Sequence, residues 1–211
     1  MDRLIAEIEA SAEWRVRELE LMKKICVVTL SNEPQHTKDQ FYRMCIPYVY
    51  AHWEGFVIEV FKQLADYINT LKLDKSNTIV ELYAFSIQNE LRPLSGKQGF
   101  EQSCKFTEKF VNQHNRPLYI DPKLVTAKSN LNYSQVDDIF KKFGIECPVS
   151  EQSADINQLV NLRNQIAHGE SGITVDYDNI SQKINTLQIM FDKITLSIYK
   201  YLSDQGYLKH A

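Results

Sequence analysis

Glycine and proline are scarce in this chain, with seven and six residues among 211. Both residue types punctuate turns and strand ends, so their scarcity favours long helices over many tight turns. No stretch approaches the roughly 18 consecutive apolar residues that a membrane-spanning helix needs. The opening segment MDRLIAEIEA is charged and amphipathic, unlike a secretory signal. We therefore expect a cytoplasmic protein.

Several signatures of catalysis and metal binding are also missing. The sequence has no glycine-rich phosphate loop, no Gly-x-Ser-x-Gly and no His-Glu-x-x-His. Its four cysteines form no Cys-x-x-Cys pair, which argues against zinc and redox sites. We expect buried free thiols, no metal site and no cofactor, the cysteines being Cys26, Cys45, Cys104 and Cys147.

The net charge of -3 argues against a protein that coats nucleic acid nonspecifically, but it leaves room for a local basic patch. Residues 92–128 hold seven basic and three acidic side chains, a local charge of +4. Aromatic residues are interleaved with the basic ones. This pattern fits either contact with single-stranded RNA or a solvated surface with its aromatics turned inward. The candidate RNA-binding residues are Lys97, Lys105, Lys109 and Arg116.

Apolar residues recur at helical spacing along most of the chain, without sustained alternation. The stripes predict helices over residues 2–29, 37–72, 76–91, 99–113, 133–143, 155–169 and 176–203, with Ser76 or Asn77 as the cap of the third. Pro47 should kink or restart the second helix. We predict an all-α bundle of about six to seven helices, with an up-and-down core and a long C-terminal helix. Residues 1–211 are expected to form one domain, with an N-terminal helical extension (1–36) and a basic, irregular insert (92–128).

The helix over residues 155–169 carries polar residues that its apolar face does not need. Arg163 falls near the middle of the apolar stripe, where an unpaired guanidinium is costly. Asn164 and His168 lie four residues apart on the flank, and Gly169 suits the position after the helix end. Basic residues also suit a helix C-terminus for reasons of the dipole alone, so plain capping is the alternative.

Glu54 is a second charge within an apolar stripe, that of the second helix. It either reaches water from the edge of the stripe or pairs with Arg163 across the core. Pairing would give each group the counter-charge that it otherwise lacks.

The spacing of Arg163, Asn164 and His168 resembles the Arg-polar-x(3)-His signature of HEPN domains. The segments YVYAHWEGFVIEVF (48–61) and SNLNYSQVDDIFKKFGI (129–145), with the long final helix, resemble the bacterial RiboL-PSP-HEPN branch over roughly residues 40–205. An acidic or polar residue at the place of Glu54 also resembles the pattern. The resemblance implies a metal-independent endoribonuclease of a toxin–antitoxin or antiphage setting.

Cleavage of RNA without a metal needs a base, a cation near the phosphorus and a proton donor. His168 can act as base or acid, Arg163 can bind two phosphate oxygens, and Asn164 can orient the imidazole. The resemblance further implies a homodimer in which two motifs face one cleft.

The alternative is a non-catalytic HEPN-like module that dimerises or binds nucleotides or proteins. Residues 145–180 hold six acidic residues and one arginine, a local charge of -5 that disfavours RNA. Such a field would suit a basic protein partner, such as an antitoxin or a defence-system protein.

Overall fold

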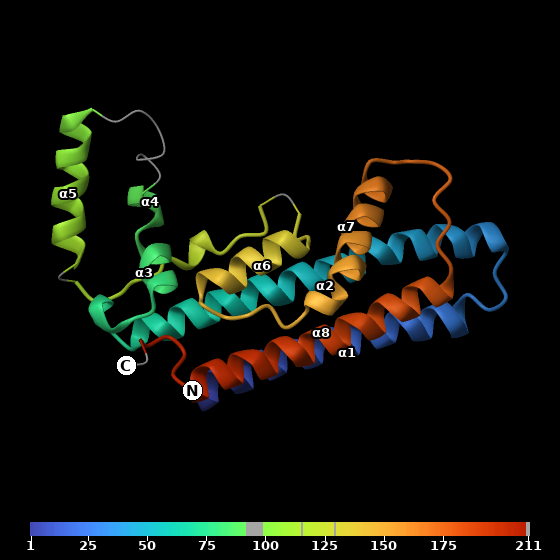
Figure 1. The fold of residues 1–211 in the computed structure, drawn as a ribbon. Helices are drawn as coiled ribbons and strands as arrows, with labels where there is room; N and C mark the ends of the chain where they lie inside the picture. Colours follow the sequence, from blue (N-terminus) through green and yellow to red (C-terminus); the bar gives the residue numbers. More distant parts are fainter. Residues whose placement is uncertain (92–98, 115, 129, 210–211) are drawn as a thin grey trace.

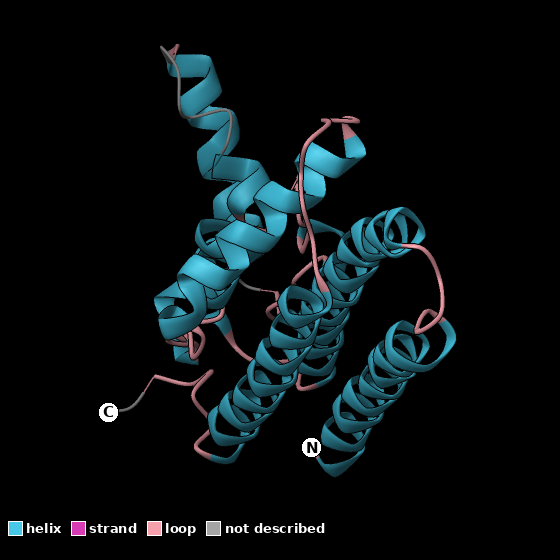
Figure 2. Cartoon of the chain, turned by 90° about the vertical axis from the view of Figure 1, so that its right-hand side faces the viewer, coloured by secondary structure: helices cyan, strands magenta, loops and turns pink. Residues whose placement is uncertain are grey.

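Three long helices form the body of the protein: α1 (Asp2–Lys24), α2 (Gln35–Thr70) and α8 (Tyr177–Ser203). In the computed structural model, which describes residues 1–91, 99–114, 116–128 and 130–209, they pack side by side (Figures 1 and 2). The start of α1 lies beside the end of α8, so these two helices run antiparallel (Figure 1).

Side chains at helical spacing from all three helices build the core. Phe56 of α2 lies 4.2 Å, centroid to centroid, from Phe191 of α8, and Phe61 contacts Phe140 at 4.6 Å. Each such side chain contributes about 1.5–3 kcal/mol when it is fully buried. The apolar residues that recur about every 3.6 residues in the sequence are therefore the ones that the fold buries.

The shorter helices surround α2. Helix α6 (Tyr133–Lys142) runs beside it and α7 (Ser153–Ala167) crosses it, whereas α3 (Val80–Ser86), α4 (Gln88–Leu91) and α5 (Phe100–His114) gather near its C-terminal end (Figure 1). The described residues thus contain seven helices of seven residues or more, plus the single turn α4, and no sheet. The prediction of an all-α bundle of six to seven helices is confirmed.

Two predicted helices differ in detail from the structure. The first extends to residue 29 as predicted, but its last turn is a π-helix over Ile25–Thr29. The helix predicted over residues 76–91 is wrong in its start, its cap and its continuity. Lys75–Asn77 is a 3₁₀ turn capped by Asp74 rather than by Ser76 or Asn77. Helix α3 begins only at Val80, and a break at Ile87 separates it from α4. Pro47 does not restart the second helix, since α2 is continuous through it.

Tertiary pairing explains the late start of α3. The backbone N–H of Ile79 donates to the carbonyl of Tyr207 at 3.2 Å, and that of Lys209 donates to Asn77 at 2.9 Å. Thr78 and Leu208 form an isolated antiparallel bridge. These bonds hold residues 78 and 79 in extended backbone, so local helix propensity is overridden.

One charged side chain is buried between α1 and α2. Arg15, only 5% exposed, donates to Glu59 at 2.8 Å and to the Ser11 hydroxyl at 2.5 Å. A Cβ on Gly55 would come within 3.2 Å of this guanidinium, so glycine makes room for it. Arg15 was not predicted to be buried, because exposed charged residues, Glu13, Arg17 and Glu18, lie close to it along α1.

Three of the four cysteines are buried free thiols as predicted, namely Cys26, Cys45 and Cys147. Cys104 is exposed on α5, so the prediction of burial is wrong for it. None of the helices in the described part of the chain combines the length and apolar character needed to cross a membrane.

Candidate active site at the end of helix α7

Helix α7 carries the predicted motif and ends where the sequence indicated. Its last residue is Ala167, His168 is the C-cap, and Gly169 adopts a left-handed φ of +75°. The N–H groups of Gly169 and Glu170 close the helix on the carbonyls of Ile166 and Gln165, at 3.1 and 3.0 Å. A glycine in this position costs no Cβ strain, which explains the residue at 169.

Arg163 is partly buried, and its guanidinium lies over the face of Tyr50 from α2. The guanidinium carbon is 4.2 Å from the ring centroid. An aromatic face attracts a cation electrostatically, whereas a hydrocarbon core does not. Tyr50 therefore supplies the favourable environment that the charge on the apolar stripe required.

Tyr50 is itself fixed by two hydrogen bonds. Its hydroxyl donates to the Glu54 carboxylate one turn further along α2 and accepts from the N–H of Leu131 at 2.8 Å. Burial first, and then the hydrogen bond to Glu54, raises the pKa of Tyr50 to about 12. Tyr50 thus stays protonated and serves as a fixed support for Arg163.

The expected ion pair between Glu54 and Arg163 is not formed. None of the ion pairs within 4.0 Å among the described residues joins them; instead Glu54 accepts from the Tyr50 hydroxyl, and Arg163 lies over the Tyr50 ring. The prediction of a direct ion pair was therefore wrong, although both charged groups contact the same side chain, that of Tyr50.

Asn164 holds a different partner from the one predicted. Its side-chain oxygen accepts from Nη1 of Arg163 at 2.8 Å, and its backbone carbonyl accepts from the N–H of His168 at 2.9 Å. The amide therefore orients the guanidinium rather than the imidazole. The imidazole of His168 is exposed, and no hydrogen bond to it is formed within the described residues.

Arg43 of α2 fixes the loop that follows the motif, by donating from Nη2 to the carbonyl of Glu170 at 2.7 Å. Arg43 and Tyr50 were not predicted as site residues. A usable signal was present, since Arg43, Pro47, Tyr50 and Glu54 are spaced by four, three and four residues and so form one row along α2.

The basic segment lies far from this row. Asn69, near the end of α2, exchanges two 2.8 Å hydrogen bonds with the backbone of Ile120. At 1.5 Å per helical residue, the axial distance from Tyr50 to Asn69 is about 28 Å. One chain therefore does not bring the basic residues to the motif.

The candidate RNA-binding residues differ among themselves. Lys105 is exposed and paired with Glu101 at 2.6 Å, Lys109 and Arg116 are exposed, and Lys97 lies outside the described residues. The aromatics of α5 are partly turned inward: Phe106, Phe110 and His114 stack in series and pack on Tyr83. Phe100, at 86% exposed, points to solvent instead.

No curated protein sequence and no solved structure shows significant similarity to the chain. The pattern of one protein family, described as RiboL-PSP-HEPN, matches residues 10–200. The match includes all of α2 and the motif helix α7, and most of α1 and α8. HEPN domains include members of ribonuclease type. The chain therefore belongs to the RiboL-PSP-HEPN family.

Proposed function

We propose that this protein is a metal-independent endoribonuclease of HEPN type. The observation that carries the proposal is the way in which Arg163 is held. Its guanidinium lies over the ring of Tyr50, and Nη1 donates to the side-chain oxygen of Asn164. Within the described residues this is its only hydrogen bond, so Nη2 and Nε are free to donate to a phosphate. A guanidinium held in this way can bind two phosphate oxygens and stabilise the charge of the transition state.

His168 supplies the proton transfers. As general base it takes the proton of the ribose 2′-hydroxyl, and the 2′-oxygen then attacks the adjacent phosphorus. The bond from phosphorus to the 5′-oxygen breaks, and that oxygen receives a proton. The products are a 2′,3′-cyclic phosphate and a free 5′-hydroxyl.

A homodimer supplies the second proton-transfer group. One chain presents one exposed imidazole at the end of α7, whereas base and acid act on opposite sides of the phosphorus. Two copies related by a two-fold axis and meeting at this end would place two His168 and two Arg163 side chains in one cleft. Two-fold pairing is the commonest form of homo-oligomer.

The proposed biological role rests on the family alone. We infer a cytoplasmic role in a toxin–antitoxin or antiphage system, with RNA as substrate. Expression in a host should arrest growth, and His168→Ala should abolish the arrest at equal protein level.

The test of catalysis is cleavage of end-labelled single-stranded RNA by purified protein in the presence of EDTA. We expect cyclic-phosphate products, and a loss of about 10²-fold or more in rate for His168→Ala and Arg163→Ala. His36→Ala and Arg3→Ala, which alter exposed residues of the same types outside the site, are the matched controls. Cleavage abolished by EDTA and restored by a divalent ion would contradict the mechanism.

A binding module without catalysis is the second candidate, and the acidic surroundings of the motif favour it. Glu170 follows the end of α7, and Asp176 and Asp178 lie at the start of α8; all three are exposed and form no ion pair within the described residues. If the purified dimer cleaves no RNA yet binds a basic protein through this surface, the second candidate holds.

A further inference from the structure

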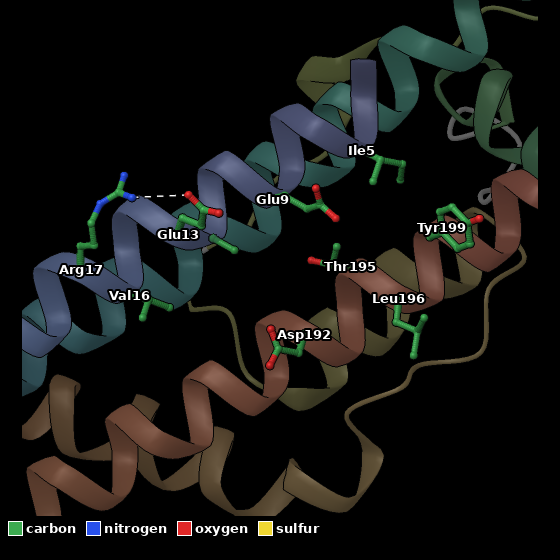
Figure 3. Close-up of a pocket in the computed structure, with 10 residues that line it drawn as sticks. Ile5, Glu9, Glu13, Val16, Arg17, Asp192, Thr195, Leu196 and Tyr199 are labelled. Carbon is green, nitrogen blue, oxygen red and sulfur yellow. Dashed lines mark hydrogen bonds and ion pairs between the residues drawn. The ribbon is translucent and has the colours of Figure 1, made fainter. Parts of the chain in front are cut away.

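A groove runs between α1 and α8 on the side of the body shown in Figure 3. Its apolar lining comes from Ile5, Ala12 and Val16 of α1 and from Leu196 and Tyr199 of α8. Leu196 is 68% exposed and Tyr199 46%, so the groove is open to solvent.

The apolar residues are arranged to receive a helix. Those on α1 recur after seven and four residues, and those on α8 after three, so each helix presents one apolar row to the groove. Ala12 and Thr195 are small residues in the lining, which lets a third backbone approach closely. Helix-in-groove recognition uses this combination of two parallel apolar rows and a shallow floor.

The groove carries an excess of negative charge. Three carboxylates line it (Glu9, Glu13 and Asp192) against one guanidinium, that of Arg17. Arg17 is already paired with Glu13 at 3.4 Å, whereas neither Glu9 nor Asp192 forms an ion pair among the described residues. The two unpaired carboxylates lie on different helices, one on each side of the groove (Figure 3).

We propose that the groove binds an amphipathic helix of another protein, with an apolar stripe flanked by lysine or arginine. The apolar stripe would cover Leu196 and Tyr199, and the basic flanks would neutralise Glu9 and Asp192. The carboxylates repel RNA. A second copy of this chain fits less well, because its exposed amphipathic helix, α5, has two lysines balanced by two glutamates and so brings no net positive charge.

The groove is separate from the end of α7. The residues that line it come from α1 and α8 alone, with none from α7 or from the loop over residues 168–176. A helix in the groove therefore leaves the motif free, and the proposal does not depend on RNA cleavage.

The test uses two synthetic peptides of about 18 residues, long enough for five helical turns. Both carry the same leucine stripe, flanked by lysines in one and by glutamates in the other. Fluorescence anisotropy should show that the lysine peptide binds at least about tenfold more tightly. Hydrogen exchange should slow in residues 5–17 and 192–199.

Variants locate the binding. Leu196→Asp should weaken binding of the lysine peptide at least about tenfold, whereas Leu21→Asp, at a similarly exposed leucine (58%) outside the groove lining, should leave it unchanged. The double variant Glu9→Lys with Asp192→Lys should reverse the preference and favour the glutamate peptide. A gain of binding cannot result from unfolding, so this variant remains informative even if Leu196→Asp is unstable.

Three outcomes would overturn the proposal. They are equal or absent binding of the two peptides, binding that is insensitive to the groove variants, and a change in the oligomeric state of the free protein on Leu196→Asp. The last result would show that a second copy covers the groove.

Discussion

The guanidinium of Arg163 lies over the ring of Tyr50, with 4.2 Å between its central carbon and the ring centroid. The phenol thereby has two tasks, since its face receives the cation while its hydroxyl bonds Glu54 and the backbone of Leu131. Substitutions can separate the two tasks, because phenylalanine keeps the face and loses only the hydroxyl.

Tyr50→Phe should destabilise the fold by about 1–3 kcal/mol, because the buried N–H of Leu131 loses its acceptor. Tyr50→Leu should cost more, since about 0.5–2 kcal/mol of cation–π attraction is lost as well. Urea unfolding of both variants measures the difference. If the contact with Arg163 matters, the extra cost of leucine should shrink in an Arg163→Met background to the part that comes from lost packing, and an undiminished extra cost there would refute the role of Tyr50 as support.

Dilution of the protein tests whether two chains share the site. Specific activity should fall on dilution in step with the dimer fraction measured by light scattering, because one chain offers one His168. Full specific activity at concentrations where only monomer remains would exclude a site built from two chains.

His52 should make stability depend on pH. It is 6% exposed, and burial lowers its pKa below the usual 6.5, with Arg15 adding to the effect and Glu18 opposing it. The unfolded chain therefore binds a proton that the folded chain resists, so the free energy of unfolding should fall as the pH drops below 6.5. The slope has an upper limit of about 1.4 kcal/mol per pH unit.

The matched measurement compares His52→Gln with His36→Gln, which changes an exposed histidine. Denaturant unfolding from pH 7 downward should show a shallower dependence for the first variant alone. An unchanged profile in His52→Gln would assign the dependence to other groups.

Removing either partner of the buried Arg15–Glu59 pair should destabilise the fold by different amounts. Glu59→Ala leaves the guanidinium buried without its carboxylate, and a cost of about 1–3 kcal/mol is expected, because Glu59 is 40% exposed and water can partly replace it. Arg15→Met removes the charge and the unpartnered Nε together, so it should cost less. Thermal and urea unfolding would show the reverse order if the ion pair were itself strongly stabilising.

Sequence periodicity predicted the long helices well, because their boundaries depend on local signals. The final helix was expected over residues 176–203 and observed over Tyr177–Ser203, with Asp176 forming a capping box. Residues 76–79 were mispredicted because their backbone bonds to a tail about 130 residues later, and no local pattern encodes that pairing.

The site was predictable in its charges but not in its contacts. Arg163 and Glu54 stood out because charge on an apolar stripe needs an explanation. Tyr50 did not, since a tyrosine in such a stripe is ordinary core composition. Which groups touch depended on the crossing of α7 over α2, a tertiary relation that neither helix specifies alone.

Pro47 lies on α2 between the two points at which that helix meets the motif region. Proline has no N–H, so the carbonyl of Arg43 receives no helical hydrogen bond from position 47. Arg43 holds the loop after His168, whereas Tyr50, beyond the proline, supports Arg163. The turn of α2 that lacks this hydrogen bond thus separates the contact with the loop after His168 from the contact with Arg163. Arg163 and the loop after His168 are therefore held by two different parts of α2, one on each side of the proline.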